Sequence, residues 1–147
     1  MLAYDINTNP LNTTEWAFPV AECIHIAGFA LSIGTVAIVD LRLLGLGLRN
    51  QTSAQLVRDT TPWTLIGLAI MLISGPVIFS SNPVFYLSNG AFQIKMACLL
   101  LAIIFNYTIH FKVAMSKDSP MLKKLVGAIS LALWVSVVAG GLFIAFI

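Results

Sequence analysis

Four long runs of apolar residues set the pattern of this chain. They cover about residues 17–39, 61–80, 91–111 and 122–147, and short polar segments separate them. A helix needs about 20 apolar residues to cross the roughly 30 Å hydrocarbon core of a bilayer. Each run therefore predicts one transmembrane helix. The fold class expected is all-α, an integral membrane four-helix bundle formed by a single domain, residues 1–147.

Local signals mark where two of these helices begin. Thr60 or Thr61 followed by Pro62 predicts an N-cap and a proline in the first turn of the second span. Ser119 followed by Pro120 predicts the same kind of start for the fourth span. Before the second span, residues 53–59 are expected to form a short helix lying in the membrane interface.

Positive charges fall in two of the connections. The connection over residues 40–61 contains Arg42, Arg49 and Arg58, and the connection over residues 112–124 contains Lys112, Lys117, Lys123 and Lys124. The loop over residues 80–90 has no charged residue. Because basic loops stay in the cytoplasm, both termini are predicted to lie outside, on the periplasmic side.

Composition supports a membrane protein and narrows the function classes. The chain is 59% hydrophobic and only 10% charged, against roughly 25% charged residues in soluble domains. The net charge of +2 does not suggest nucleic-acid binding. No nucleophile–base arrangement or phosphate-binding loop is evident, so an electron carrier or membrane subunit is expected rather than an enzyme.

Ionisable residues inside the spans are the candidate functional residues, because burying them in lipid is costly. Counting about 1.5 Å per residue along each helix sorts them into two layers. The outer layer contains Glu22, His25, Lys95 and Met96, with Tyr86 and Asn89 nearby, and the inner layer contains Asp40, Arg42, Asn106 and His110. The two histidines are then roughly 20 Å apart, too far to ligate one haem together.

The outer layer has three interpretations. Glu22 and Lys95 could form an ion pair, with His25 hydrogen-bonded beside them. Alternatively, His25 could ligate haem b or a metal ion, with Lys95 or Met96 as the opposite ligand and Glu22 or Tyr86 tuning the site. The third interpretation is a proton relay through Glu22 and His25.

His110 is a further candidate for cofactor binding. Its place two residues before Lys112 also fits the headgroup level of the membrane. A second haem at His110 would need a ligand that the chain does not obviously provide.

Three segments carry a resemblance to a known family. They read "IHIAGFALSIGTVAIVDLRLLGLGLR", "YLSNGAFQIKM" and "NYTIHF", and they are similar to an uncharacterised family of small bacterial four-helix inner-membrane proteins. The residues that carry the resemblance are His25, Asp40, Arg42, Asn89, Phe92, Lys95, Asn106 and His110. The resemblance implies the same fold and a multi-pass location in the bacterial inner (plasma) membrane. A looser likeness is to four-helix b-type cytochromes and to copper-resistance membrane proteins, although the chain lacks their paired histidines at one depth and their Met or His clusters.

The leading hypothesis is a small membrane haem-b-binding protein in electron transfer, with His25 as the principal iron ligand and a periplasmic redox partner. The alternative is a non-enzymatic membrane subunit or permease component with a buried Glu/His/Lys proton or ion site. Small residues recur along the first and fourth spans and permit close helix contact in the lipid bilayer. A homo-oligomer or a place in a larger membrane complex is therefore expected.

Overall fold

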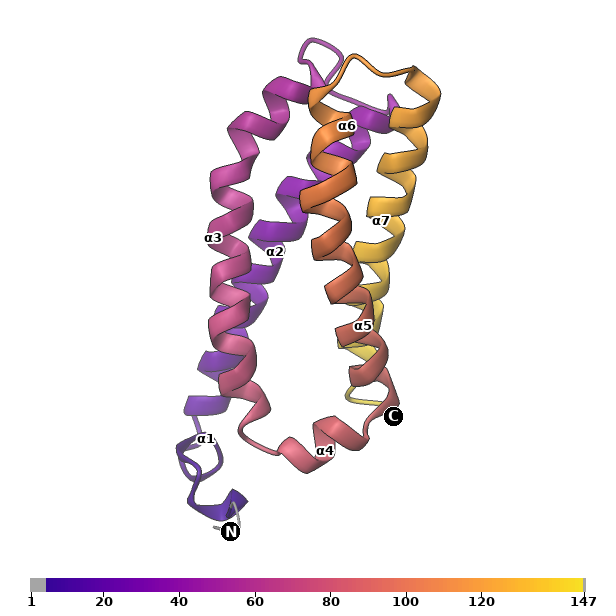
Figure 1. The fold of residues 1–147 in the computed structure, drawn as a ribbon. Coiled ribbons are helices and arrows are strands. Elements are labelled where there is room, and N and C mark those ends of the chain that lie inside the picture. Colours follow the sequence, from indigo (N-terminus) through magenta and orange to yellow (C-terminus); the bar gives the residue numbers. More distant parts are fainter. Residues whose placement is uncertain (1–4, 147) are drawn as a thin grey trace.

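The computed structural model describes residues 5–146 and shows an all-helical chain (Figure 1). Its elements are η1 (Ile6–Thr8), α1 (Pro10–Thr13), α2 (Ala17–Leu44), α3 (Ser53–Phe79), α4 (Pro83–Ser88), α5 (Gly90–Phe105), η2 (Asn106–His110), α6 (Phe111–Met115) and α7 (Pro120–Phe143). In the described residues, four helices are long and apolar enough to cross a membrane: α2, α3, the continuous run Gly90–Met115, and α7. The all-α four-helix prediction is confirmed. Residue 147, the expected end of the fourth span, lies outside the described residues.

The start of the second span differs from the prediction. α3 begins at Ser53, where Thr52 is the N-cap and its hydroxyl accepts a hydrogen bond from the Gln55 N–H at 3.1 Å. The expected interfacial helix at 53–59 is thus the first part of α3. Thr60 and Thr61 do not cap, because their hydroxyls donate to carbonyls one turn back inside the helix. The start of α7 agrees with the sequence, with Ser119 as its N-cap.

The four long helices form a bundle whose two ends differ. α2 packs against both α3 and α7, and α5 packs against α7. The third span meets α3 chiefly through α6, near the end that holds the two basic connections. Both ends of the described chain, residues 5 and 146, lie at the other end, where α4 joins α3 to α5 (Figure 1). The bundle is therefore closed at the basic end and more open between α3 and α5 at the other.

The packing of α2 on α3 depends on glycine. A Cβ placed on Gly67 of α3 would lie 2.6 Å from both the Gly28 carbonyl oxygen and the Ser32 backbone nitrogen of α2. Such contacts are shorter than van der Waals packing allows, so only glycine permits this crossing. Close approach of this kind is how helices associate where lipid offers no hydrophobic driving force.

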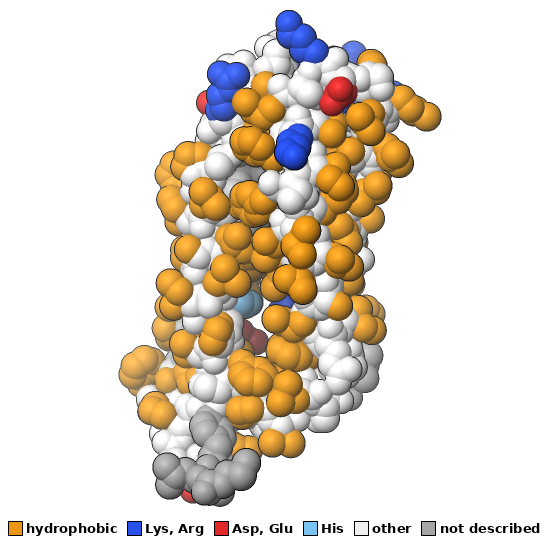
Figure 2. Space-filling model, in the orientation of Figure 1, with side chains coloured by type: hydrophobic (Ala, Val, Ile, Leu, Met, Phe, Trp, Pro, Cys, Tyr) orange, Lys and Arg blue, Asp and Glu red, His pale blue; other side chains and the backbone are white. Residues whose placement is uncertain are grey.

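The outer surface of the bundle is apolar along its length and charged at its basic end. Large hydrophobic side chains are widely exposed on the helices, among them Ile73 at 71% and Ile94 at 62%. Figure 2 shows these orange side chains covering the flank, with Lys and Arg gathered at the end opposite the termini. A surface of this kind fits helices that are long and apolar enough to cross a membrane.

Candidate functional site

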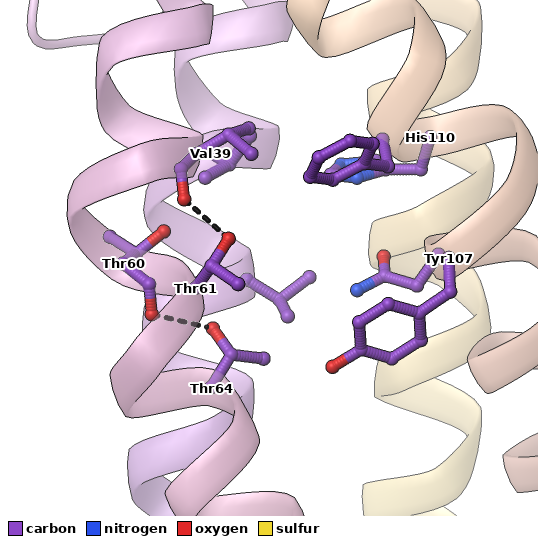
Figure 3. Close-up of a pocket in the computed structure, with 10 residues that line it drawn as sticks. Val39, Thr60, Thr61, Thr64, Tyr107 and His110 are labelled. Carbon is purple, nitrogen blue, oxygen red and sulfur yellow. Dashed lines mark hydrogen bonds between the residues drawn. The ribbon is translucent and has the colours of Figure 1, made fainter.

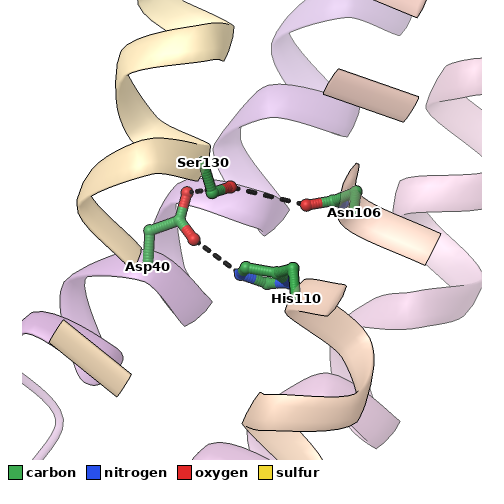
Figure 4. Close-up of polar contacts among 4 residues, drawn as sticks. All are labelled: Asp40, Asn106, His110 and Ser130. Carbon is green, nitrogen blue, oxygen red and sulfur yellow. Dashed lines mark hydrogen bonds and ion pairs between the residues drawn. The ribbon is translucent and has the colours of Figure 1, made fainter. Parts of the chain in front are cut away.

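A buried polar cluster joins three helices in the closed half of the bundle (Figure 4). Nε2 of His110 lies 2.6 Å from Oδ1 of Asp40. The second carboxylate oxygen, Oδ2, accepts a hydrogen bond from the Ser130 hydroxyl at 2.8 Å. Asp40 is 0% exposed and His110 4%. Among the described residues this is the one acidic and basic side-chain pair within 4.0 Å, and it lies inside the bundle.

Local backbone features bring the members of the cluster together. Asn106 and His110 are the first and last residues of η2, a π-helical stretch within the third span. Residues four apart share one face of a helix, and the i to i+5 hydrogen bonds of a π-helix widen the turn that carries this face. On α7, a Cβ at Gly127 would lie 3.0 Å from the Asp40 carbonyl oxygen. Glycine there lets α7 approach α2 closely enough for Ser130 to reach Asp40.

The cluster can hold one exchangeable proton between a carboxylate and an imidazole. Both Asp40 oxygens have partners, which is how a bundle tolerates a buried carboxylate. The Ser130 hydroxyl has one hydrogen, and the nearer acceptor is Asp40, since Oδ1 of Asn106 is 3.4 Å away. With Nε2 of His110 engaged by Asp40, Nδ1 is the remaining ring nitrogen, and no hydrogen bond from the described residues reaches it.

A small cavity adjoins His110 on the side away from α7 (Figure 3). Its volume is about 30 Å³, which is enough for a water molecule. Hydroxyl, amide and imidazole groups and four apolar side chains line it: Thr60, Thr61, Thr64, Asn106, Tyr107 and His110, with Val36, Val39, Val57 and Phe111. The Thr64 hydroxyl also meets the Thr35 hydroxyl at 2.7 Å. The polar groups thus extend from the buried pair through the cavity to α2.

His25 lies in the open half of the bundle, and its hydrogen bonding fixes its orientation. Nδ1 of His25 is 2.8 Å from the Ser74 hydroxyl oxygen of α3. The Ser74 hydroxyl donates its hydrogen to the Ile70 carbonyl oxygen, at 2.6 Å. The hydroxyl must therefore accept from Nδ1–H of His25, which leaves Nε2 with a free lone pair. Histidine ligands of metals are typically held this way, with the second nitrogen donating to the protein.

The other predicted outer residues surround this histidine loosely. Figure 2 shows a hollow between α3 and α5 in which a histidine, a basic and an acidic side chain are visible. Lys95 of α5 is within electrostatic range of His25, while its Nζ would lie 3.5 Å from a Cβ placed on Gly141 of α7. Glu22 is exposed, and Met96 is 45% exposed on α5. The structure thus places Lys95 near His25, Glu22 near Tyr86 and Met96 on the outer surface.

The ion pair suggested for the outer layer is absent from the described residues, and Arg42 has a backbone partner. In the described part of the chain, no ion pair joins Glu22 to Lys95. Arg42, two residues after Asp40, donates from Nε to the Gln51 carbonyl at 2.6 Å. The partners of Asp40 come instead from other helices.

Tyr86 belongs to an aromatic cluster at the end of the bundle that holds the termini. Its ring packs against Phe79 and Phe92, with centroids 6.0 Å and 5.4 Å away. Burial raises the pKa of the Tyr86 phenol, and the nearby Glu22 carboxylate adds to this effect. Tyr86 is therefore a protonated hydrogen-bond donor at neutral pH. Asn89 is 5% exposed and caps α5 through the Phe92 N–H, so it has a structural role.

The residues that the sequence missed are Ser130 and the threonines of the cavity. From the sequence alone, Ser130 is interpreted as one more small packing residue of α7. Thr60 and Thr61 are interpreted as helix caps. The one signal available was depth, which already placed Asp40, Asn106 and His110 in the same layer. Within the described residues, no three His, Cys, Asp or Glu side chains gather closely enough to hold a metal ion.

Comparison with known proteins gives one match. A family model described as "Family of unknown function (DUF6644)" matches residues 16–147. No curated protein sequence matches the chain, and no solved structure does.

Proposed function

The chain belongs to DUF6644, a family of unknown function, and we propose that it is a non-enzymatic membrane subunit or permease component that binds and passes protons at Asp40 and His110. The observation that carries this proposal is the 2.6 Å contact between these two side chains at a position with almost no solvent exposure. Aspartate and histidine buried within a membrane span are costly and typically serve ion or proton pathways.

The surroundings of the pair support proton exchange over a purely structural role. A pair that only holds helices together needs no more than its two side chains. Here a cavity of about 30 Å³ with hydroxyl-bearing walls also adjoins His110. Water held in such a cavity can accept a proton from the imidazole, since the cavity is polar and large enough. His110 also sits at the end of a π-helical stretch, and such stretches are frequent at functional sites.

We infer the orientation from charge. Both basic connections lie at one end of the bundle and both described ends of the chain lie at the other (Figures 1 and 2). With the basic end in the cytoplasm, both termini are periplasmic and the Asp40–His110 pair lies in the cytoplasmic half of a bacterial inner membrane. We also expect the bundle to associate with a second copy of the chain or with a larger membrane complex.

Proton flux in proteoliposomes tests this function. We expect liposomes containing the wild-type protein to take up protons several times faster than empty liposomes under an imposed membrane potential. Asp40→Asn and His110→Gln should reduce the rate to that of empty liposomes, because neither side chain could then exchange the shared proton. A pH-sensitive dye inside the liposomes measures the rate.

The matched control is Asp59→Asn, which removes an exposed carboxylate of α3 outside the cluster and should leave the flux unchanged. Size-exclusion profiles of every variant verify that the bundle is intact. Equal rates for wild type, Asp40→Asn and empty liposomes would refute proton conduction by this chain alone.

A second candidate function is haem-b binding in electron transfer, and the geometry of His25 favours it. Ser74 fixes the tautomer so that Nε2 carries a free lone pair, and Gly75 lies beside the ring, with a Cβ placed there 3.5 Å from Cε1 of His25. A bare metal ion would find too few protein ligands among the described residues. Haem brings four nitrogen ligands of its own and needs only one or two from the protein.

Three residues at or near the ring of His25 have side chains suited to holding haem. His25 would hold the iron, Ser74 would orient the imidazole, and Lys95 would supply a second ligand or a positive charge. Bound haem would supply one-electron redox chemistry, with a periplasmic protein as its redox partner. Met96, exposed on the far surface of α5, is a weaker second ligand than Lys95.

The reduced-minus-oxidised visible spectrum of protein purified from haem-replete cells tests the haem proposal. We expect Soret and alpha bands that disappear in His25→Ala, because the iron loses its ligand. Ser74→Ala should weaken the bands, since the imidazole loses its anchor. A flat wild-type spectrum would contradict haem binding, and bands lost in His110→Gln instead would assign the iron to the other histidine.

A further inference from the structure

A second cavity lies at the basic end of the bundle, apart from both sites described above. It is about 330 Å³ in volume and is formed where α2 ends and α3 and α7 begin. Volumes of roughly 300–1,000 Å³ are typical of small-ligand sites. The polar residues that line it are Arg42, Thr52, Ser53, Asp118, Lys123 and Lys124.

Positive charge prevails in this cavity. Three basic side chains, Arg42, Lys123 and Lys124, face one carboxylate, that of Asp118. Asp118 is engaged by the Ser116 hydroxyl next to it, and no ion pair among the described residues joins it to any of the three cations. With one carboxylate against three cations, the cavity lining keeps a net positive charge.

The basic side chains come from different helices and are partly held in place. Nε of Arg42 donates to the Gln51 carbonyl at 2.6 Å, so the two terminal nitrogens of its guanidinium are left for a ligand. Nζ of Lys123 lies 3.4 Å from the hydroxyl of Ser53, which is itself buried and donates to the Ala114 carbonyl. A fixed guanidinium beside two ammonium groups matches the geometry of phosphate recognition.

The N-termini of two helices add to the positive charge at this cavity. α3 and α7 are 27 and 24 residues long, and both begin at the wall of this cavity. The N-terminus of a helix carries a partial positive charge and unpaired backbone N–H groups. Here this effect adds to the three basic side chains and does not by itself define the site.

We propose that this cavity binds a phosphate group, as the headgroup of an anionic phospholipid or as free phosphate. The lipid source has support in the apolar side chains that adjoin the lining residues in sequence. Leu46 and Met121 are 74% and 78% exposed, so acyl chains could contact them while the phosphate enters the cavity. Basic pockets between transmembrane helices on the cytoplasmic side bind anionic headgroups in this way.

Thermal stability of the purified full-length protein tests the proposal. The protein is titrated with short-chain phosphatidylglycerol, with short-chain phosphatidylcholine and with inorganic phosphate against chloride at equal ionic strength. Stabilisation by phosphatidylglycerol but not by phosphatidylcholine or phosphate assigns the site to an anionic lipid headgroup. Stabilisation by inorganic phosphate as well assigns it to the phosphate group itself.

Two double variants test whether the phosphate group binds in this cavity. Lys123→Gln/Lys124→Gln should weaken the apparent affinity for the bound phosphate species at least tenfold. The matched control, Lys112→Gln/Lys117→Gln, removes the same charge from the same end but from residues outside the cavity lining, and it should retain the affinity. Equal weakening in both variants, or no stabilisation by any anion beyond chloride, would overturn the proposal.

Discussion

Replacing Asp40 by alanine is expected to destabilise the bundle by about 3–5 kcal/mol, because it breaks a buried pair and leaves the other partner uncompensated. His110 would lose the acceptor of its Nε2–H, and the Ser130 hydroxyl would lose its nearer acceptor. Both side chains are almost fully buried, so water cannot readily replace the lost partner. The cluster joins α2, the third span and α7, and three helix contacts weaken together.

The change in unfolding free energy can be measured by denaturant titration in detergent micelles. Asp59→Ala is the control, since Asp59 is exposed on α3 and its loss should change stability by less than about 0.5 kcal/mol. The double variant Asp40→Ala/His110→Ala should lose less than the sum of the two single variants, because the residues act as a pair. Additive losses would show that Asp40 and His110 are not coupled.

Replacing Gly67 by alanine is expected to destabilise the bundle by about 1–3 kcal/mol through overpacking. The added Cβ would lie 2.6 Å from backbone atoms of Gly28 and Ser32. Because these are backbone atoms, no side-chain rotation can relieve the clash, and α2 and α3 must move apart. Gly67→Leu should be worse still and should reduce the amount of folded protein recovered from membranes.

Gly34 supplies the matched control for this prediction. It lies in α2, and a Cβ there would meet nothing within 4 Å. Gly34→Ala should therefore stabilise the protein by about 0.5–1 kcal/mol, as alanine restricts the unfolded chain more than glycine. The midpoint of thermal unfolding in detergent, measured for both variants, should shift in opposite directions. A shift of the same sign and size would mean that the α2–α3 crossing is not as close as described.

The two candidate sites lie in different halves of the bundle. His25 and Ser74 lie in the half that opens between α3 and α5, and Asp40 and His110 lie in the closed half. Asp40 follows His25 by fifteen residues on α2, or about 22 Å of helix. The haem proposal and the proton proposal therefore concern different depths of the bundle, and the spectra and flux measurements test them separately.

The amino-acid sequence was sufficient to predict the four apolar helices, because the length of an apolar run decides whether a helix can cross a membrane. It also predicted that the two basic connections share one end, since helices joined by short loops alternate in direction. Depth could be counted as well, because each helical residue rises by about 1.5 Å. That count placed His110 in the layer of Asp40 before any contact was known.

Which side chains meet was decided only by the tertiary structure. A contact between helices depends on the rotation of each helix about its axis, and the sequence fixes this rotation weakly when apolar residues cover every face. The π-helical stretch at Asn106–His110 changes the rotation of the third span locally, and Gly127 sets how closely α7 approaches Asp40. For this reason His110 pairs with Asp40 inside the bundle instead of lying beside Lys112 at its surface, and Ser130 completes the site.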